Sequence, residues 1–316
     1  MMISIFSLVA SLISFLLSAI SVGDVIAVDN EKLRRQASDQ RNLIVDGARA
    51  EPGEFPWFVS LLKDSETDQP ACGGTLIAPN RVLTAGHCVV PDPLVTELGP
   101  PAFVRLKHTT HSDGVTVPVD CVSLHPDYSP RYNDLAIVKL AENAPSTQFV
   151  ELNSDTSFPW GKDESLTTVG FGSTSTLVGI IGTLLNGGRV PKSRRLKKVV
   201  TRALTEAECQ HEWNECADYR YHLCDEPDND GHSCYGDSGG PVLDDYHVQV
   251  GIVSFITRGF RCNSGAPHVA TNVAQYYNWI LNEIRDSTCS DDNTLGYSKD
   301  FVDPCLLPIN STGRSP

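Results

Sequence analysis

The feature that most restricts the fold is a series of short apolar runs separated by Pro, Gly, Asn and Asp. The runs occupy residues 56–62, 73–78, 81–86, 102–106, 115–124, 135–140, 165–171, 196–204, 241–245, 248–255 and 268–273. Many short strands with turn residues between them are typical of an all-β barrel or sandwich. Such a domain often uses about 200–250 residues. The 316 residues are therefore enough for one domain with flanking segments.

A helix is predicted near the end of this domain. Val273–Arg285 reads VAQYYNWILNEIR, and its apolar residues recur at helical spacing. Tyr276, Ile280 and Ile284 would lie on one face, which indicates a helix packed against the barrel or sandwich.

The amino-terminal segment has the pattern of a signal peptide. Residues 3–20 are almost continuously apolar, and the small residues Ala19 and Ser21 offer a cleavage site before Val22. The run has no Lys or Arg before it, which leaves a signal anchor as the alternative, but its length near the lower limit for a membrane span favours the signal peptide. We predict a signal peptide over residues 1–21, a secreted extracellular protein and no stable membrane association.

The remaining boundaries follow from composition. Residues 22–43 are polar and charged, which suits a propeptide, and the domain is expected over residues 44–287. Residues 288–316 form an acidic extension with two cysteines, expected to be an irregular tail. Asn310 begins the chain's only Asn-X-Ser/Thr sequence and is the predicted glycosylation site.

Charge and cysteine content argue against a nucleic-acid-binding protein and a structural zinc site, and they indicate a disulfide-bonded protein. The formal charge of −14 argues against nucleic acid as a partner. The one basic run, Lys192–Lys198, is expected to be a solvated loop. Ten cysteines in a secreted chain predict disulfides. A zinc site among the cysteines of residues 209–224 is not favoured, because their spacings differ from the paired pattern of structural zinc sites.

Three separated motifs supply the residue types of a nucleophilic acyl-transfer site. They read LTAGHC at residues 83–88, NDLAIVKL at residues 133–140 and CYGDSGGP at residues 234–241. A serine hydroxyl needs a base within hydrogen-bond reach and a third group that orients the base. His87, Asp134 and Ser238 are the candidate base, acid and nucleophile. In these motifs and in the order His, Asp, Ser, the chain resembles the chymotrypsin/trypsin family of serine endopeptidases over roughly residues 44–284.

The resemblance implies two six-stranded antiparallel β-barrels with the triad at their junction and a C-terminal helix. It also implies peptide-bond hydrolysis through an acyl-enzyme. The backbone N–H groups of Gly236 and Ser238 would form the oxyanion hole, and the Ser254 hydroxyl would help to hold the aspartate. Gly86 stands where the family usually has Ala, a departure expected to be minor.

The resemblance also implies a disulfide framework. The expected bridges are Cys72–Cys88, Cys209–Cys224 and Cys234–Cys262, with Cys121–Cys289 as a further pair. Cys216 and Cys305 would then remain as the last pair.

Activation is where the chain departs from the family pattern. In this family, a cut before the Ile-Val pair frees an amino group that pairs with the aspartate before the nucleophile; here these groups are Ile44 and Asp237. The family usually has Arg or Lys directly before the Ile, whereas this chain reads Arg41-Asn42-Leu43. A cut after Leu43, a cut after Arg41 with further trimming, and a permanently inactive chain all stay open. We predict a zymogen that exposure of Ile44 switches on.

The pocket residues implied by the resemblance do not match a trypsin-like preference for Lys or Arg. The expected substrate-binding positions are His232, Ser233, Ser254, Ile256 and His268. His232 stands six residues before the nucleophile, where trypsin-like members have Asp, although the nearby Asp230 keeps a basic preference open. Bulky walls favour small aliphatic side chains. Alternatively, the two histidines attract an acidic side chain when protonated, or simply fill the pocket.

The proposed chemistry needs no cofactor and no metal. Calcium is not expected, because the connection at residues 107–116 offers only Asp113 as a carboxylate. The expected partners of a monomeric chain are protein or peptide substrates and protein protease inhibitors. The rival hypothesis is a noncatalytic protease homologue that acts as a binding or inhibitor-docking protein.

Overall fold

The computed structural model describes residues 47–65, 70–91, 98–146, 148–159, 161, 163–173, 192–213, 217–227, 233–255, 267–286 and 288. All of them belong to one compact unit, Ile44–Pro316. The predicted signal peptide, the predicted propeptide and residues 289–316 lie outside the described residues, as does the predicted glycosylation site Asn310. These assignments therefore stay predictions.

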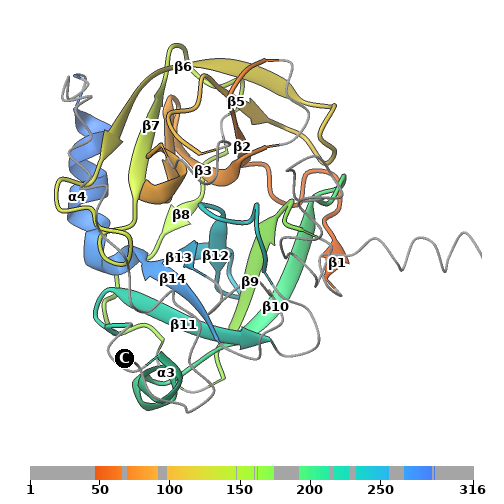
Figure 1. Cartoon of the computed structure of the whole chain (residues 1–316). Coiled ribbons are helices and arrows are strands. Elements are labelled where there is room, and N and C mark those ends of the chain that lie inside the picture. The colour runs from red at the N-terminus through yellow and green to blue at the C-terminus, as the bar shows by residue number, and fades with distance from the viewer. Residues whose placement is uncertain are drawn as a thin grey trace, which may run out of the picture. The chain divides into compact units, whose positions relative to one another are not determined.

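Antiparallel strands close into a first barrel in the order β2-β3-β4-β7-β6-β5, seen in the upper part of Figure 1. Its strands are β2 (Phe58–Leu62), β3 (Cys72–Ala78), β4 (Arg81–Thr84), β5 (Phe103–Leu106), β6 (Val115–Leu124) and β7 (Ala136–Leu140). Closure pairs both edges of each strand, so these short strands support one another without an open sheet edge.

A second ring runs β9-β10-β11-β14-β13-β12 and returns to β9. Its strands are β9 (Ser165–Gly170), β10 (Lys197–Ala203), β11 (His222–Pro227), β12 (Pro241–Leu243), β13 (Val248–Phe255) and β14 (His268–Asn272). The short strands β1 (Ala48–Arg49) and β8 (Glu151–Leu152) pair with β10 and β13 outside the ring. The predicted fold of two six-stranded antiparallel barrels is confirmed.

One apolar cluster extends from the first barrel into the second, whose interior also contains a separate cluster that includes Leu166, Val242 and Val250. The cluster that extends across both barrels contains Val82 and Leu83 of the first barrel, Val169 and Ile252 of the second, and Ile280 near the end of the chain. Because protein interiors are close-packed, this shared cluster fixes the loops that cross between the barrels.

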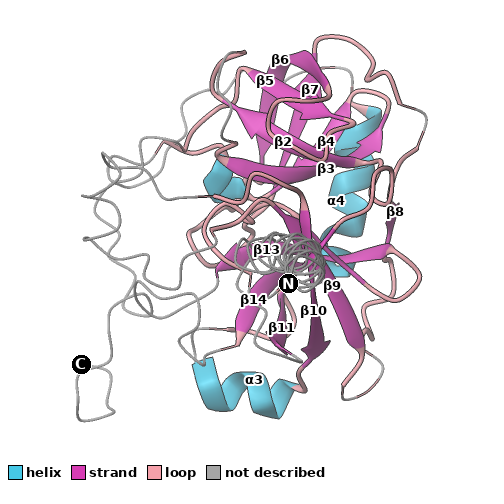
Figure 2. Ribbon diagram, turned by 90° about the vertical axis from the view of Figure 1, so that its right-hand side faces the viewer, coloured by secondary structure: helices cyan, strands magenta, loops and turns pink. Residues whose placement is uncertain are grey.

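The predicted C-terminal helix is confirmed as α4 (Val273–Arg285). The Asn272 side chain caps it by accepting a hydrogen bond from the Ala274 amide at 3.2 Å. Tyr276 and Ile280 are buried, and Ile284 packs against the shared core as expected. Figure 2 shows α4 beside the strands and the short helix α3 (Glu206–Trp213) at the far end of the second barrel.

The structure corrects the expectation for the basic run and adds elements that were not predicted. The basic run Lys192–Lys198 is not a solvated loop, because Lys197 begins β10 and both Lys192 and Lys197 are buried. Helix α3 and strand β11 were not predicted. Cys209 and Trp213 form the buried side of α3, which packs on the second barrel through a separate apolar cluster.

Disulfides join Cys72 to Cys88 and Cys209 to Cys224, as expected. Cys121 and Cys234 are also disulfide-bonded, while their expected partners Cys289 and Cys262 lie outside the described residues. Neither α3 nor α4, the α-helices among the described residues, has the length and apolar character that crossing a membrane requires.

Candidate active site

The candidate base and acid meet at the junction of the barrels. His87 lies in a 3-10 turn, Gly86–Cys88, directly after β4. Its ring Nδ1 lies 2.8 Å from Oδ2 of Asp134, and its backbone N–H donates to Oδ1 at 2.8 Å. The imidazole is 24% exposed and the carboxylate 1%. Nδ1 therefore faces a buried acceptor, and the ring keeps a partly open edge.

Several elements hold the Asp134 carboxylate in place. The Ser254 hydroxyl of β13 donates to Oδ2, and the Thr271 hydroxyl of β14 donates to the backbone carbonyl of Asp134 at 3.0 Å. Burial alone would raise the pKa of Asp134, but the charge of His87 and the hydrogen bonds from His87 and Ser254 hold it below its ordinary value. This carboxyl group is therefore ionised at neutral pH and can orient and stabilise a protonated imidazole.

The backbone before Asp134 is fixed by α4. Asn133 adopts a positive φ of 56°. Its side-chain oxygen accepts a hydrogen bond from the Tyr276 hydroxyl at 3.1 Å, and its amide donates to the Asp127 carbonyl at 2.8 Å. The C-terminal helix thus supports the loop that carries the acid.

Gly86 is more constrained than its sequence context suggested. A Cβ at this position would lie 2.7 Å from Cδ2 of Tyr128 and 3.0 Å from Cδ1 of Leu124. The absence of a side chain lets the Tyr128 ring pack directly against the turn that carries His87. The expectation that a methyl group here makes little difference does not fit this contact.

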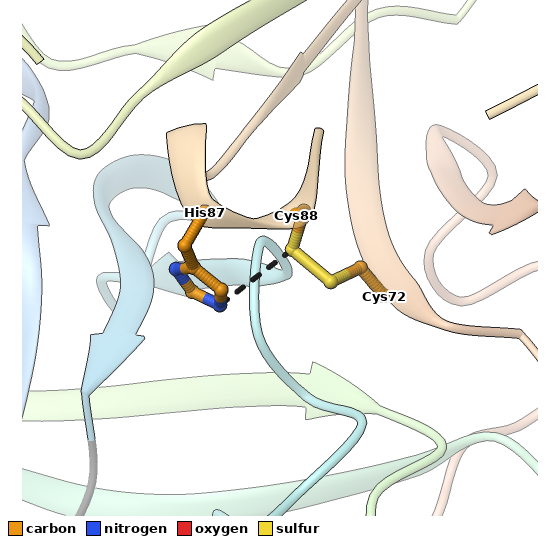
Figure 3. Close-up of side chains that lie close together, drawn as sticks. All are labelled: Cys72, His87 and Cys88. Atoms are coloured by element: carbon orange, nitrogen blue, oxygen red, sulfur yellow. Dashed lines mark hydrogen bonds between the residues drawn. A yellow bond between two sulfur atoms is a disulfide. The ribbon is translucent and has the colours of Figure 1, made fainter. Parts of the chain in front are cut away.

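His87 also lies beside the Cys72–Cys88 disulfide (Figure 3). Its Nε2 is 3.7 Å from Cys88 Sγ, and the Cys72, Cys88 and His87 donor atoms lie within 4.8 Å of one another. The sulfur atoms of Cys72 and Cys88 are bonded to each other, so neither is available as the thiolate that a zinc ion would need. This group of side chains does not fit a metal site.

The loop of the candidate nucleophile is bound to both barrels. The amide of Gly73, in β3, donates to the Ser238 carbonyl at 2.9 Å, and the Gly239 amide donates to Val253, in β13, at 2.8 Å. Gly239 has φ +76°, and a Cβ there would lie 2.2 Å from Oγ1 of Thr84. Thr84 stands three residues before His87. The structure therefore brings the Ser238 loop against the segment that leads to the histidine.

Asp237 is buried beneath this loop. It is 1% exposed. Oδ1 accepts from the Gly172 amide at 2.7 Å and Oδ2 from the Cys234 amide at 2.8 Å. Burial raises the pKa of Asp237 to about 6, although the two amides and the positive charges of His268 and Lys192 act in the opposite direction. A further cation close to this carboxyl group would stabilise its ionised form.

A model of the trypsin family matches residues 44–280 of this chain. The chain belongs to the trypsin family. It is 29% identical over 270 residues to the CLIP domain-containing serine protease B10 of Anopheles gambiae, covering 77% of this chain and 70% of that protein. It is 30% identical over 266 residues to a tryptase of Mus musculus, covering 76% of this chain and 88% of that protein.

Solved structures give the same fold. Mouse neuropsin, described as a serine protease, matches with a TM-score of 0.62 and 21% identity, covering 76% of this chain and 99% of that one. The chain spans only 60%, 41% and 40% of three further relatives. Trypsin-family proteases act on protein substrates.

The specificity positions of this trypsin-family chain are described only in part. His232 and Ile256 lie outside the described residues. Ser233 is buried, and its hydroxyl lies 3.1 Å from Nδ1 of His268. His268, 2% exposed, pairs in register with Asp225 of β11, and its Nδ1 is 3.3 Å from the Asp225 carboxylate.

Sequence reasoning missed Asp225. It follows Cys224 in the polar segment HLCDEP, which has no strand-like alternation to mark it as buried. Its carboxylate gives His268 an acidic partner inside the protein. The histidine therefore does not stand as an isolated cation.

Proposed function

We propose that this trypsin-family chain is a serine endopeptidase that hydrolyses peptide bonds through an acyl-enzyme. The observation that carries the proposal is the pairing of His87 Nδ1 with the buried Asp134 carboxylate, next to the Ser238 loop. The carboxylate fixes the ring tautomer in which Nε2 is the available base. Nucleophilic catalysis by serine requires this arrangement.

In the proposed reaction, the Ser238 hydroxyl attacks the peptide carbonyl while His87 takes its proton. The negative charge on the carbonyl oxygen is stabilised by the N–H groups of Gly236 and Ser238. Gly236 has φ +101°, a backbone conformation that residues with side chains rarely adopt, which supports a dedicated role in shaping this loop. His87 then gives the proton to the leaving amine as the peptide bond breaks. In the second half, water attacks the acyl-enzyme while His87 takes its proton, and His87 returns that proton to the Ser238 oxygen as the ester bond breaks.

We further propose a secreted zymogen that is activated when the amino group of Ile44 becomes available to Asp237. A buried carboxyl group with a raised pKa is poorly compensated, so a new ammonium group nearby would stabilise its ionised form. The disulfides support synthesis in an oxidising compartment. We also propose that the chain is a monomer, that its substrates are proteins or peptides, and that protein protease inhibitors bind to it.

For the substrate residue before the scissile bond, we propose a small aliphatic side chain. His268 is buried and lies against Asp225, so its charge is offset within the protein and gives little attraction to an acidic substrate. A peptide library tests this directly. Acidic preference that disappears in His268→Ala would instead support recognition by the histidine.

The rival function is a noncatalytic homologue that docks an inhibitor or another protein. It is favoured by the activation segment, where Arg41 stands two residues further from Ile44 than the family pattern places it. Its distinguishing property is binding without covalent reactivity at Ser238.

Labelling with a fluorophosphonate probe separates the two functions. The probe reacts covalently with an activated serine, and the proteins to compare are the full-length chain, a chain beginning at Ile44 and its Ser238→Ala variant. The endopeptidase proposal predicts strong labelling of the chain that begins at Ile44 and none of Ser238→Ala. A correctly folded chain beginning at Ile44 that stays unlabelled would establish the noncatalytic homologue.

A further inference from the structure

Lys192 occupies an unusual place for a lysine. It is 9% exposed, and its Nζ donates a hydrogen bond to the Pro70 carbonyl at 2.7 Å. Transfer of an ammonium group from water into a protein interior is costly unless hydrogen bonds and negative charge compensate it. We therefore expect a nearby group with negative charge that compensates for the burial of the Lys192 ammonium group.

The aliphatic part of Lys192 packs against the loop of the candidate oxyanion hole. A Cβ on Gly236 would lie 3.1 Å from both Cδ and Cε of Lys192, and 3.5 Å from Cα of Gly172. Gly236 has φ +101° and precedes Asp237 directly. The lysine stem and Gly172 thus form one wall against which Gly236 rests.

The charge of Lys192 acts on Asp237. Burial raises the pKa of Asp237, and the amides of Cys234 and Gly172, the charge of His268 and the charge of Lys192 lower it. His268 lies in β14, whereas Lys192 lies in the segment before β10. Lys192 is therefore an internal cation that favours the ionised carboxylate.

Backbone hydrogen bonds hold the lysine and the carboxylate in one frame. The amide of Ser193 donates to the carbonyls of Phe171 and Gly172, at 3.1 and 3.0 Å. Residues Ser173 and Lys192 form an isolated β-bridge, and the Ser173 amide donates to the Tyr235 carbonyl at 2.8 Å. A displacement of Lys192 would therefore also displace the loop that contains Gly236.

We propose that Lys192 is a positioning residue for the oxyanion hole, which supplies an internal positive charge to Asp237 and a wall for Gly236. The proposal rests on the proposed endopeptidase function and adds to it a cation that is present before Ile44 is exposed. In the uncut chain the charge of Lys192 favours the ionised form of Asp237. In the cut chain its stem keeps Gly236 in the conformation that presents its N–H group.

The charge is tested without any activity, in full-length protein carrying Ser238→Ala. The free energy of unfolding is measured between pH 4 and pH 8 for this protein and for the additional variants Lys192→Met, Lys192→Arg and Lys198→Met. Lys192→Met keeps the stem length and removes the charge, so we expect the pH at which Asp237 ionises in the folded chain to rise by at least about half a unit. Lys192→Arg restores the original midpoint. His268 is the same in all four proteins and cancels in the comparison.

Lys198→Met is the matched control, because Lys198 belongs to the same basic run but pairs with Glu54. It should leave the midpoint unchanged. Equal midpoints in the parent protein and in Lys192→Met would overturn the role of the charge, as would a Lys198→Met shift as large as that of Lys192→Met.

The stem is tested by the rate of fluorophosphonate labelling in chains that begin at Ile44 and retain Ser238. Lys192→Ala removes the wall beside Gly236, and we expect labelling about tenfold slower, a fraction of the loss seen when an oxyanion donor is removed outright. Lys192→Met, which keeps the wall, should label faster than Lys192→Ala. Labelling of Lys192→Ala at the rate of the unmodified chain contradicts the role of the stem. If the unmodified chain itself does not label, the endopeptidase proposal fails, while the unfolding measurement still decides whether Lys192 serves Asp237.

Discussion

Replacing Asp237 with Asn removes a buried carboxyl group and with it a specific dependence of stability on pH. In the uncut chain this side chain accepts hydrogen bonds from the Gly172 and Cys234 amides. An Asn side chain has one acceptor oxygen in place of two, so the variant loses one of these bonds. That loss is the same at every pH and adds a constant offset to the free energy of unfolding.

The pH-dependent part comes from the pKa of Asp237, which burial raises from the ordinary 3.8 to about 6. Because the folded chain holds the proton more tightly than the unfolded chain, this carboxyl contributes its full stability below pH 4. The contribution is lost as pH rises through 6. A difference of about 2 pH units corresponds to about 3 kcal/mol. About 2.5 kcal/mol of this falls between pH 4 and pH 7, so the uncut chain should lose that much stability over this range relative to Asp237→Asn.

Urea unfolding at intervals of pH, followed by tryptophan fluorescence, measures this difference. Both proteins carry Ser238→Ala so that neither can digest itself. Titration of all other groups is common to the two proteins and cancels. If the difference between the two free energies stays constant from pH 4 to pH 7, within the extrapolation error of about 10–15%, the account of Asp237 is wrong.

Two further predictions concern the turn and the acid of the candidate site. Gly86→Ala should lower the free energy of unfolding by about 1–3 kcal/mol, because its methyl group would overlap the Tyr128 ring. Urea unfolding should show a smaller cost in a Tyr128→Ala background, and an equal cost there would contradict the overlap. Asp134→Asn should leave the fold intact and lower kcat by a factor on the order of ten thousand, because the amide no longer fixes the His87 tautomer. Steady-state hydrolysis by chains beginning at Ile44 measures this, and a loss below about tenfold would remove Asp134 from the mechanism.

The strands and the last helix could be predicted because their apolar residues are numerous and regularly spaced. The eleven apolar runs contain all the strands of both rings except β11. Strand β11 carries Asp225, Glu226 and Pro227, residues that strands usually avoid. It is a strand because tertiary pairing with β10 and β14 outweighs these local preferences.

Helix α3 and the burial of two lysines could not be predicted from the sequence pattern either. Only Cys209 and Trp213 of α3 are buried, so the helix has no continuous apolar face to reveal it. Lys192 and Lys197 lie in a run that composition alone assigns to solvent. Lys197 pairs with Gly170 in the second barrel and Lys192 bridges to Ser173, and a single sequence does not show either pairing.

In the candidate site, the catalytic residues could be predicted from the sequence, but the residues that support them could not. His87, Asp134 and Ser238 stand in motifs that identify them by spacing, and the structure places the first two in hydrogen-bond contact. The residues that support them come from distant segments and carry no motif. Tyr276 reaches Asn133 from α4, and Asp225 reaches His268 across a strand pair, so both contacts depend on the complete fold.

A pre-steady-state burst tests the central claim, acyl transfer through Ser238, most directly. A chain beginning at Ile44 is mixed with excess chromogenic ester whose leaving group is released on acylation. We expect a burst of about one product molecule per chain, followed by slower turnover, and no burst with Ser238→Ala. Release without a burst, at the same rate in the unmodified chain and in Ser238→Ala, would contradict an acyl-enzyme formed at this serine.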